Sequence, residues 1–136
     1  MTAPRYLLDT NICIYIAKHN PPAVRQHFIL HPREHLAMSV ITLGELRHGA
    51  EKSQSRGKAV KVLSKLIEVI QILEIPVETG VCYGQIRAVL EKQGQIIGNN
   101  DLWIAAHALA SGLILVTNNV REFSRVENLN IEDWAI

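Results

Sequence analysis

Cysteine and long apolar runs are both scarce in this chain. Its 136 residues include two cysteines, Cys13 and Cys82, which lie far apart and form no Cys-x-x-Cys spacing. This scarcity excludes a disulfide framework and a zinc–thiolate site, and we expect two buried free thiols in a reducing cytoplasm. The longest apolar runs, such as residues 113–116, fall far short of the roughly 20 residues that span a bilayer. No signal peptide is expected, because a charged residue precedes any long apolar stretch.

An excess of charge of one sign is also missing. Lys and Arg number 14 against 13 Asp and Glu, which gives a net charge of +1. Bulk charge therefore does not indicate a strongly basic nucleic-acid binder, although the sum says nothing about local basic patches. The hydrophobic fraction of 48% excludes a disordered chain. The length fits one domain with its own core, which we expect to span residues 1–136.

The apolar residues predict strands and helices that alternate along the chain. Strands are expected at residues 5–9, 36–39, 72–76, 113–117 and 129–131. Helices are expected at residues 12–18, 22–30, 41–52, 58–72, 78–93 and 102–111, with a short helical turn at 118–123. The expected strands are apolar without alternation, which is typical of strands buried on both faces. The pattern predicts an α/β/α sandwich with a central, mainly parallel sheet.

Polar residues follow several of these strands. Asp9 ends the first strand and Thr117 the fourth, Glu45 lies on the helix after the second strand, and Asp101 begins the helix before the fourth. In an open parallel sheet, ligands bind beyond the carboxyl ends of the strands. Carboxylates gathered there repel one another unless a cation compensates, and hard oxygen ligands suit Mg²⁺ or Mn²⁺. Such an ion is well suited to phosphodiester hydrolysis.

Each of these residues also has a purely structural explanation. Asp9 could cap the first helix, and Thr42 with Glu45 fits a capping box. Asp101 could be a first-turn acid favoured by the helix dipole, and the asparagines at 118–119 could be turn residues. Taken one at a time, these alternatives stay open. Their coincidence at one sheet edge favours a functional site.

Four segments, in this order, resemble the motifs of PIN-domain nucleases. They are LDTN at residues 8–11, SVITLGEL at 39–46, IGNNDLWIAAHA at 97–108 and VTNNVREF at 116–123. Each motif alone is weak evidence, whereas four in order within 136 residues are highly specific. Length, order and spacing resemble the VapC toxins of bacterial VapBC toxin–antitoxin modules, and the resemblance covers essentially the whole chain.

The resemblance implies a Rossmann-like PIN fold and a metal-dependent endoribonuclease that uses Mg²⁺ or Mn²⁺. Such a toxin is inhibited by a VapB antitoxin, forms a homodimer, and cuts RNA, with tRNA as one substrate class among relatives. By position, Asp9, Glu45 and Asp101 are the implied catalytic acids, with Asp9 and Asp101 as metal ligands. Thr10, Asn11 and Thr117 are the implied supporting residues.

The last motif departs from the family pattern at one position. Many PIN domains carry a fourth acid where this chain has Asn119. Glu122, about one helical turn further on, could supply the missing carboxylate, or Asn119 could act through water. The number of metal ions stays open.

Two other functions fit parts of the sequence. Asn119 favours a degenerate PIN-like module that binds RNA or protein without cleavage. Asp9 after a strand is also typical of a receiver-like phosphoacceptor, but no lysine follows Lys92, and such domains need one after a late strand. His107 lies six residues past Asp101 and is expected to be a packing or surface histidine and not a general base.

Overall fold

The central sheet has five strands, all parallel, in the order β3-β2-β1-β4-β5. The computed structural model describes residues 3–136. The strands are β1 (Tyr6–Leu8), β2 (Leu36–Ser39), β3 (Gln71–Leu73), β4 (Ile114–Val116) and β5 (Ile131–Glu132). The residues of β1 and β2 are all buried, as the absence of alternation predicted, whereas those of the edge strands β3 and β5 are partly exposed.

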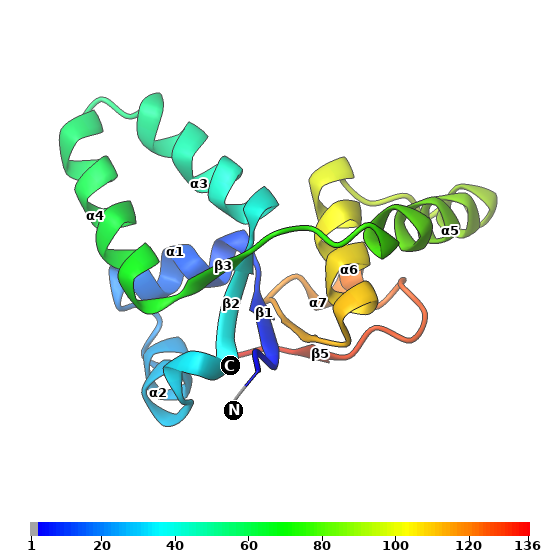
Figure 1. The fold of residues 1–136 in the computed structure, drawn as a ribbon, viewed down its shortest axis with the longest axis horizontal. Helices are drawn as coiled ribbons and strands as arrows, with labels where there is room; N and C mark the ends of the chain where they lie inside the picture. Colours follow the sequence, from blue (N-terminus) through cyan, green and yellow to red (C-terminus); the bar gives the residue numbers. More distant parts are fainter. Residues whose placement is uncertain (1–2) are drawn as a thin grey trace.

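Helices cover both faces of this sheet (Figure 1). They are α1 (Thr10–Lys18), α2 (Pro22–Leu30), α3 (Val40–Glu51), α4 (Arg56–Val69), α5 (Glu78–Lys92), α6 (Asn99–Ser111) and the short α7 (Val120–Phe123), with a 3₁₀ turn at Arg33–His35. Leu8 belongs to a core cluster with α1, α2 and α4, while Leu7 belongs to a second cluster with α5 and α6. Consecutive strand residues point to opposite faces, so one apolar dipeptide serves both cores.

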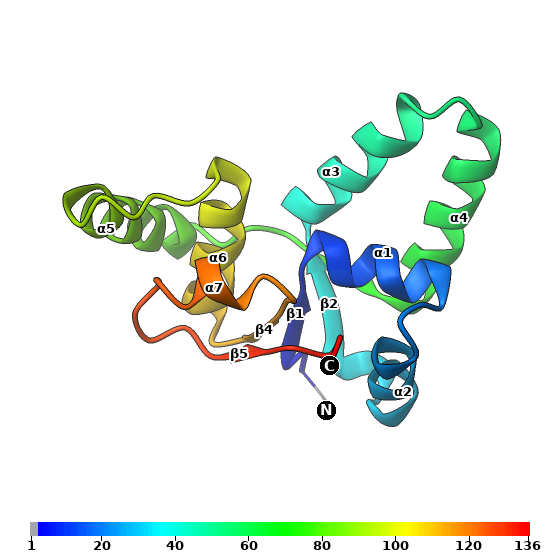
Figure 2. The ribbon, with the colours of Figure 1, turned by 180° about the vertical axis from the view of Figure 1, so that it is seen from behind.

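The arrangement leaves the carboxyl end of β1 between two helices. Figures 1 and 2 show α3 and α6 on either side of that end, with the α3–α4 hairpin projecting away on one side and α5 on the other. The first residue of α1 and the middle of α3, at Glu45, lie near the start of α6, because Thr10 and Asn100 both form hydrogen bonds with Glu45. The fold gathers the motifs of the sequence at one edge of the sheet, as the parallel topology predicts.

Several expected boundaries were wrong. Helix α6 begins at Asn99 and not at residue 102, because the Gly98 carbonyl accepts the Leu102 amide at 2.9 Å. Helix α4 begins at Arg56, two residues before the expected start at residue 58, and β5 begins two residues later than expected. These segments hold polar or turn-favouring residues in regular structure, which propensity alone does not predict.

The two thiols differ from each other. Cys13 is buried as expected, but Cys82 is half-buried, so the expectation of two buried thiols was wrong for one of them. Cys82 lies on α5, which extends beyond the edge of the sheet, whereas Cys13 lies on α1 in the core (Figure 1). No helix within residues 3–136 combines the length and apolar character that crossing a membrane requires.

Candidate active site

Asp9 is a buried carboxylate at the carboxyl end of β1. Its side chain is 5% exposed, and its Oδ1 accepts the Ile12 amide at 2.9 Å, which caps α1. Burial raises the pKa of Asp9, hydrogen bonds from the Thr117 hydroxyl and the Ile12 amide lower it, and the charges of Glu45 and Asp133 raise it; the net pKa is above the ordinary value. The capping role is therefore present, but it does not account for the other acids around this carboxylate.

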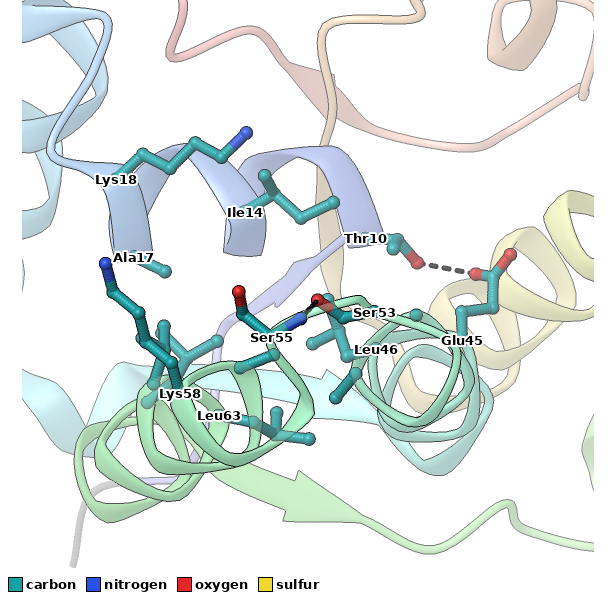
Figure 3. Close-up of a pocket in the computed structure, with 15 residues that line it drawn as sticks. Thr10, Ile14, Ala17, Lys18, Glu45, Leu46, Ser53, Ser55, Lys58 and Leu63 are labelled. Carbon is teal, nitrogen blue, oxygen red and sulfur yellow. Dashed lines mark hydrogen bonds between the residues drawn. The ribbon is translucent and has the colours of Figure 1, made fainter.

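Glu45 is held from two other helices. The Thr10 hydroxyl donates to Glu45 Oε1 at 2.5 Å (Figure 3), and Asn100 Nδ2 donates to Glu45 Oε2 at 3.4 Å. The capping-box alternative for Glu45 was wrong. Helix α3 begins at Val40, and its cap is the Ser39 hydroxyl, which accepts the Ile41 amide at 3.1 Å. Glu45 therefore takes no part in capping α3, and its carboxylate faces Thr10 and Asn100.

Asp101 lies in the first turn of α6 and is half-buried. Burial raises its pKa to about 6, and the charges of Glu45, Glu122 and Asp9 add to the increase. Each of these three carboxylates is thus near enough to Asp101 to disfavour its ionised form. The structure brings Asp9, Glu45 and Asp101 together, as the sequence predicted, and adds Glu122 to the same electrostatic neighbourhood.

The segment after β4 places Asn119 beside Glu122. The buried Thr117 hydroxyl accepts the Asn119 amide at 2.9 Å, and Asn119 Nδ2 donates to Glu122 Oε2 at 3.0 Å. Arg125, which could have paired with Glu122, donates instead to the carbonyl oxygens of Gln95 and Ile96. The neutral Asn119 therefore orients the acid that follows it.

Asn11 differs from the other expected supporting residues. It is exposed in the first turn of α1 and forms no side-chain hydrogen bond within residues 3–136. The structure does not bring it into contact with the acids. Thr10 and Thr117, by contrast, each contact one of them.

The donor set fits a hard divalent cation by its chemistry. It consists of carboxylates and hydroxyls without Cys or His, the combination that Mg²⁺ and Mn²⁺ prefer, and the mutual repulsion of the acids is what a cation relieves. In the described part of the chain, however, no three His, Cys, Asp or Glu side chains form a ready-made metal site. Asp9 and Glu45 accept hydrogen bonds from the protein in this arrangement, and their carboxylates keep lone pairs that could still bind an ion.

Two hollows meet at Glu45. A polar cleft of about 360 Å³ is lined by Glu45, the cap residue Gly98 and the first turn of α6, from Asn99 to Asp101. A larger groove of about 660 Å³ runs between α1, α3 and α4, with Thr10 and Glu45 at one end and Lys18 and Lys58 at the other (Figure 3). Most of its lining is apolar, including Ile14, Leu46, Val62, Leu63 and Leu66.

The sequence reasoning missed two features near the site. Asp133 is close enough to raise the pKa of Asp9, and it follows β5, whose carboxyl end points to the same sheet edge. Placing the last strand two residues later would have indicated it. The hydrogen bond between His107 and Ser39 joins residues 68 positions apart, and no local pattern signals it.

Comparisons with known proteins agree with the fold and the motifs. A family model described as PIN domain matches residues 6–129. The chain is 44% identical to the tRNA(fMet)-specific endonuclease VapC of Shigella flexneri, over 96% of this chain and 98% of that protein. Its structure is similar to DNA-bound VapBC from Salmonella typhimurium, with a TM-score of 0.90, 40% identity and coverage of 96% and 98%. It is also similar to promoter-bound VapBC2 from Rickettsia felis, with a TM-score of 0.89, 38% identity and coverage of 95% and 98%.

Proposed function

The chain belongs to the PIN-domain family and, within it, to the VapC ribonucleases, and we propose that it is a toxin that hydrolyses RNA with a divalent metal ion bound by Asp9 and Asp101. The observation that carries this proposal is the convergence of Asp9, Glu45, Asp101 and Glu122 at the carboxyl edge of the sheet, where the charge of Glu45 raises the pKa of both aspartates and that of Glu122 raises the pKa of Asp101. Carboxylates that are held close together and have perturbed pKa values are typical of a functional site.

The residues around the acids have distinct proposed roles. When bound, a Mg²⁺ or Mn²⁺ ion activates water and neutralises the charge that develops on the phosphate. Asp9 and Asp101 are its proposed ligands. Thr10 and Asn100 orient Glu45 toward the same cleft, and the Thr117 hydroxyl favours the ionised form of Asp9. Attack by water predicts products with a 3′-hydroxyl.

Transfer RNA is the proposed substrate class, because a relative 44% identical over nearly the full length is named a tRNA(fMet)-specific endonuclease. Cellular RNA as the substrate places the proposed activity in the cytoplasm. Sequencing of RNA ends after brief induction in growing cells tests the substrate. Cuts concentrated in one tRNA support the proposal, and cuts spread over messenger RNA contradict it.

We expect Glu122→Gln to raise the Mg²⁺ or Mn²⁺ concentration needed for half-maximal cleavage. The change keeps size and hydrogen bonding to Asn119 but removes a charge that acts on Asp101, and loss of such outer partners costs about 10-fold or more in metal affinity. Metal titration of the purified variants measures the effect. Glu127→Gln, at an exposed acid, is the matched control. An unchanged titration for Glu122→Gln would limit the site to three acids.

An antitoxin is the proposed partner, because the similar structures are VapBC complexes, and we assign its binding segment to the groove between α1, α3 and α4. The groove is largely apolar and ends at Thr10 and Glu45, so an occupant there also covers the acids. Val62 lines it and is 42% exposed. A residue of this kind contributes to binding and little to stability.

The Val62→Glu variant should therefore no longer be inhibited by the antitoxin, and it should keep its ribonuclease activity. A buried, unpaired charge in an interface costs several kcal/mol, roughly 100-fold or more in affinity. Co-expression with the neighbouring antitoxin gene should relieve growth arrest by the native toxin but not by this variant. Val89→Glu, on α5 at 47% exposure, is the control and should still be neutralised. If co-expression relieves growth arrest equally for both variants, the antitoxin binds a different surface.

A further inference from the structure

His107 is an unusual residue for the interior of α6. It is completely buried, among Ala105, Ala106 and Ala108, which are also buried. Its Nδ1 lies 3.0 Å from the Ser39 hydroxyl, while Nε2 has no hydrogen-bond partner in the described part of the chain. A buried polar atom without a partner lowers stability, and an apolar side chain of similar size would avoid that cost. Stability alone therefore does not explain the imidazole.

The hydrogen bond has a defined direction. Ser39 Oγ already accepts the Ile41 amide as the cap of α3, so its own hydrogen is free to be donated. The acceptor in reach is Nδ1 of His107, which places the ring proton on Nε2. Burial lowers the pKa of His107 and keeps the ring neutral, consistent with Nδ1 acting as an acceptor.

This hydrogen bond joins the two helices that carry acids of the site. Ser39 lies six residues before Glu45 on α3, and His107 lies six residues after Asp101 on α6. Six helical residues span about 9 Å, so each acid lies a short rigid segment away from the link. Glu45 and Asp101 line the same cleft of about 360 Å³. Movement of one helix against the other at the link therefore changes the separation of the two acids.

Within residues 3–136, one other side-chain hydrogen bond joins α6 to α3. It is the exposed contact of 3.4 Å between Asn100 and Glu45, which is long and open to solvent. The bond between Thr10 and Glu45 connects α3 to α1 and leaves α6 out. The buried pair of His107 and Ser39 is thus the better-defined polar link from α6 to the start of α3.

We propose that His107 is a positioning residue, whose hydrogen bond to Ser39 sets the placement of α6 against the start of α3 and so holds Asp101, a proposed metal ligand, in place beside Glu45. The inference rests on the proposed function, since it concerns the same metal site. His107 itself contacts neither the ion nor the RNA in this role.

Three substitutions separate positioning from packing. His107→Asn places an amide oxygen where Nδ1 lies and can still accept from Ser39, whereas His107→Gln places its amide near Nε2 and cannot. His107→Leu removes the hydrogen bond and fills the space. We expect the Leu variant to unfold close to the native urea midpoint, because it removes the unpaired Nε2 but leaves the buried Ser39 hydroxyl hydrogen without its acceptor.

The decisive measurement is Mn²⁺ binding to the RNA-free protein by titration calorimetry. Leu and Gln should weaken binding about 10-fold, as loss of outer-shell partners does, and Asn should restore it to within about twofold. Native affinity in the Leu variant, or equal weakening by Asn and Gln, would overturn the positioning role. If Leu fails to fold, the Asn and Gln pair decides alone. Native affinity in Asp9→Asn would instead overturn the proposed metal site.

Discussion

Replacing Asp9 by Asn should reduce RNA cleavage at least about 100-fold, the loss that follows removal of a charged group acting directly on the reacting centre. The substitution removes an anionic metal ligand with almost no change in volume. It should leave the fold intact, because Asn is as good a helix cap as Asp and can still accept the Ile12 amide. Initial rates at saturating Mg²⁺, with circular dichroism of both proteins, measure the two effects.

The chain offers a matched control for this substitution. Asp133 is the third aspartate, raises the pKa of Asp9, and accepts the Ala135 amide at 2.8 Å, a bond that Asn preserves. Asp133→Asn removes a neighbouring charge without removing a proposed ligand, so cleavage should change less than about threefold, within the range of a screened charge effect. Full activity of Asp9→Asn would contradict the metal-site assignment.

Asp101→Asn should abolish cleavage and yet stabilise the metal-free protein at pH 7.5. The pKa of Asp101 is raised from 3.8 to about 6, so the folded state binds more protons than the unfolded state between these values. Stability contributed by protonation is therefore present below pH 4 and is lost as pH rises through about 6. Above pH 6 the folded protein carries a disfavoured charge, which Asn removes.

The expected gain is about 1 kcal/mol after discounting a two-unit shift for the solvent access of a half-buried group, or about 3–5 °C in Tm. Thermal unfolding in EDTA at pH 7.5 and at pH 4 measures it. The gain should be present at pH 7.5 and nearly vanish at pH 4, where native Asp101 is already neutral. A loss of stability at both pH values would show that the carboxylate supports the fold.

The local parts of the fold could be predicted from sequence. Pro22 at the first position of α2 and Gly112 after α6 mark helix ends by backbone geometry, and β2 was predicted over its full extent. The order of strands and helices along the chain could also be predicted, from continuous apolar runs for the strands and helical spacing of apolar residues for the helices. These features depend on residues a few positions apart, so a single sequence contains the information.

The contacts that connect the acids could not be predicted in the same way. Thr10 bonds Glu45 across 35 positions, and His107 reaches Ser39 across 68. Such pairs depend on how α1, α3 and α6 pack, and no periodicity specifies that packing. The capping box at Thr42 was wrong for a related reason, since an earlier residue, Ser39, starts the helix. The sequence could indicate which acids share an edge, but not which neighbours orient them.

The most direct test of the central claim is to identify the products of RNA cleavage by the purified protein with and without metal. We expect cleavage that requires Mg²⁺ or Mn²⁺, stops with EDTA, is lost in Asp9→Asn, and leaves a 3′-hydroxyl and a 5′-phosphate. RNA that binds the protein and stays intact with either metal would rule out the proposed ribonuclease and favour a degenerate binding module. Cleavage that persists in EDTA and leaves a 2′,3′-cyclic phosphate would contradict the proposed metal-dependent mechanism.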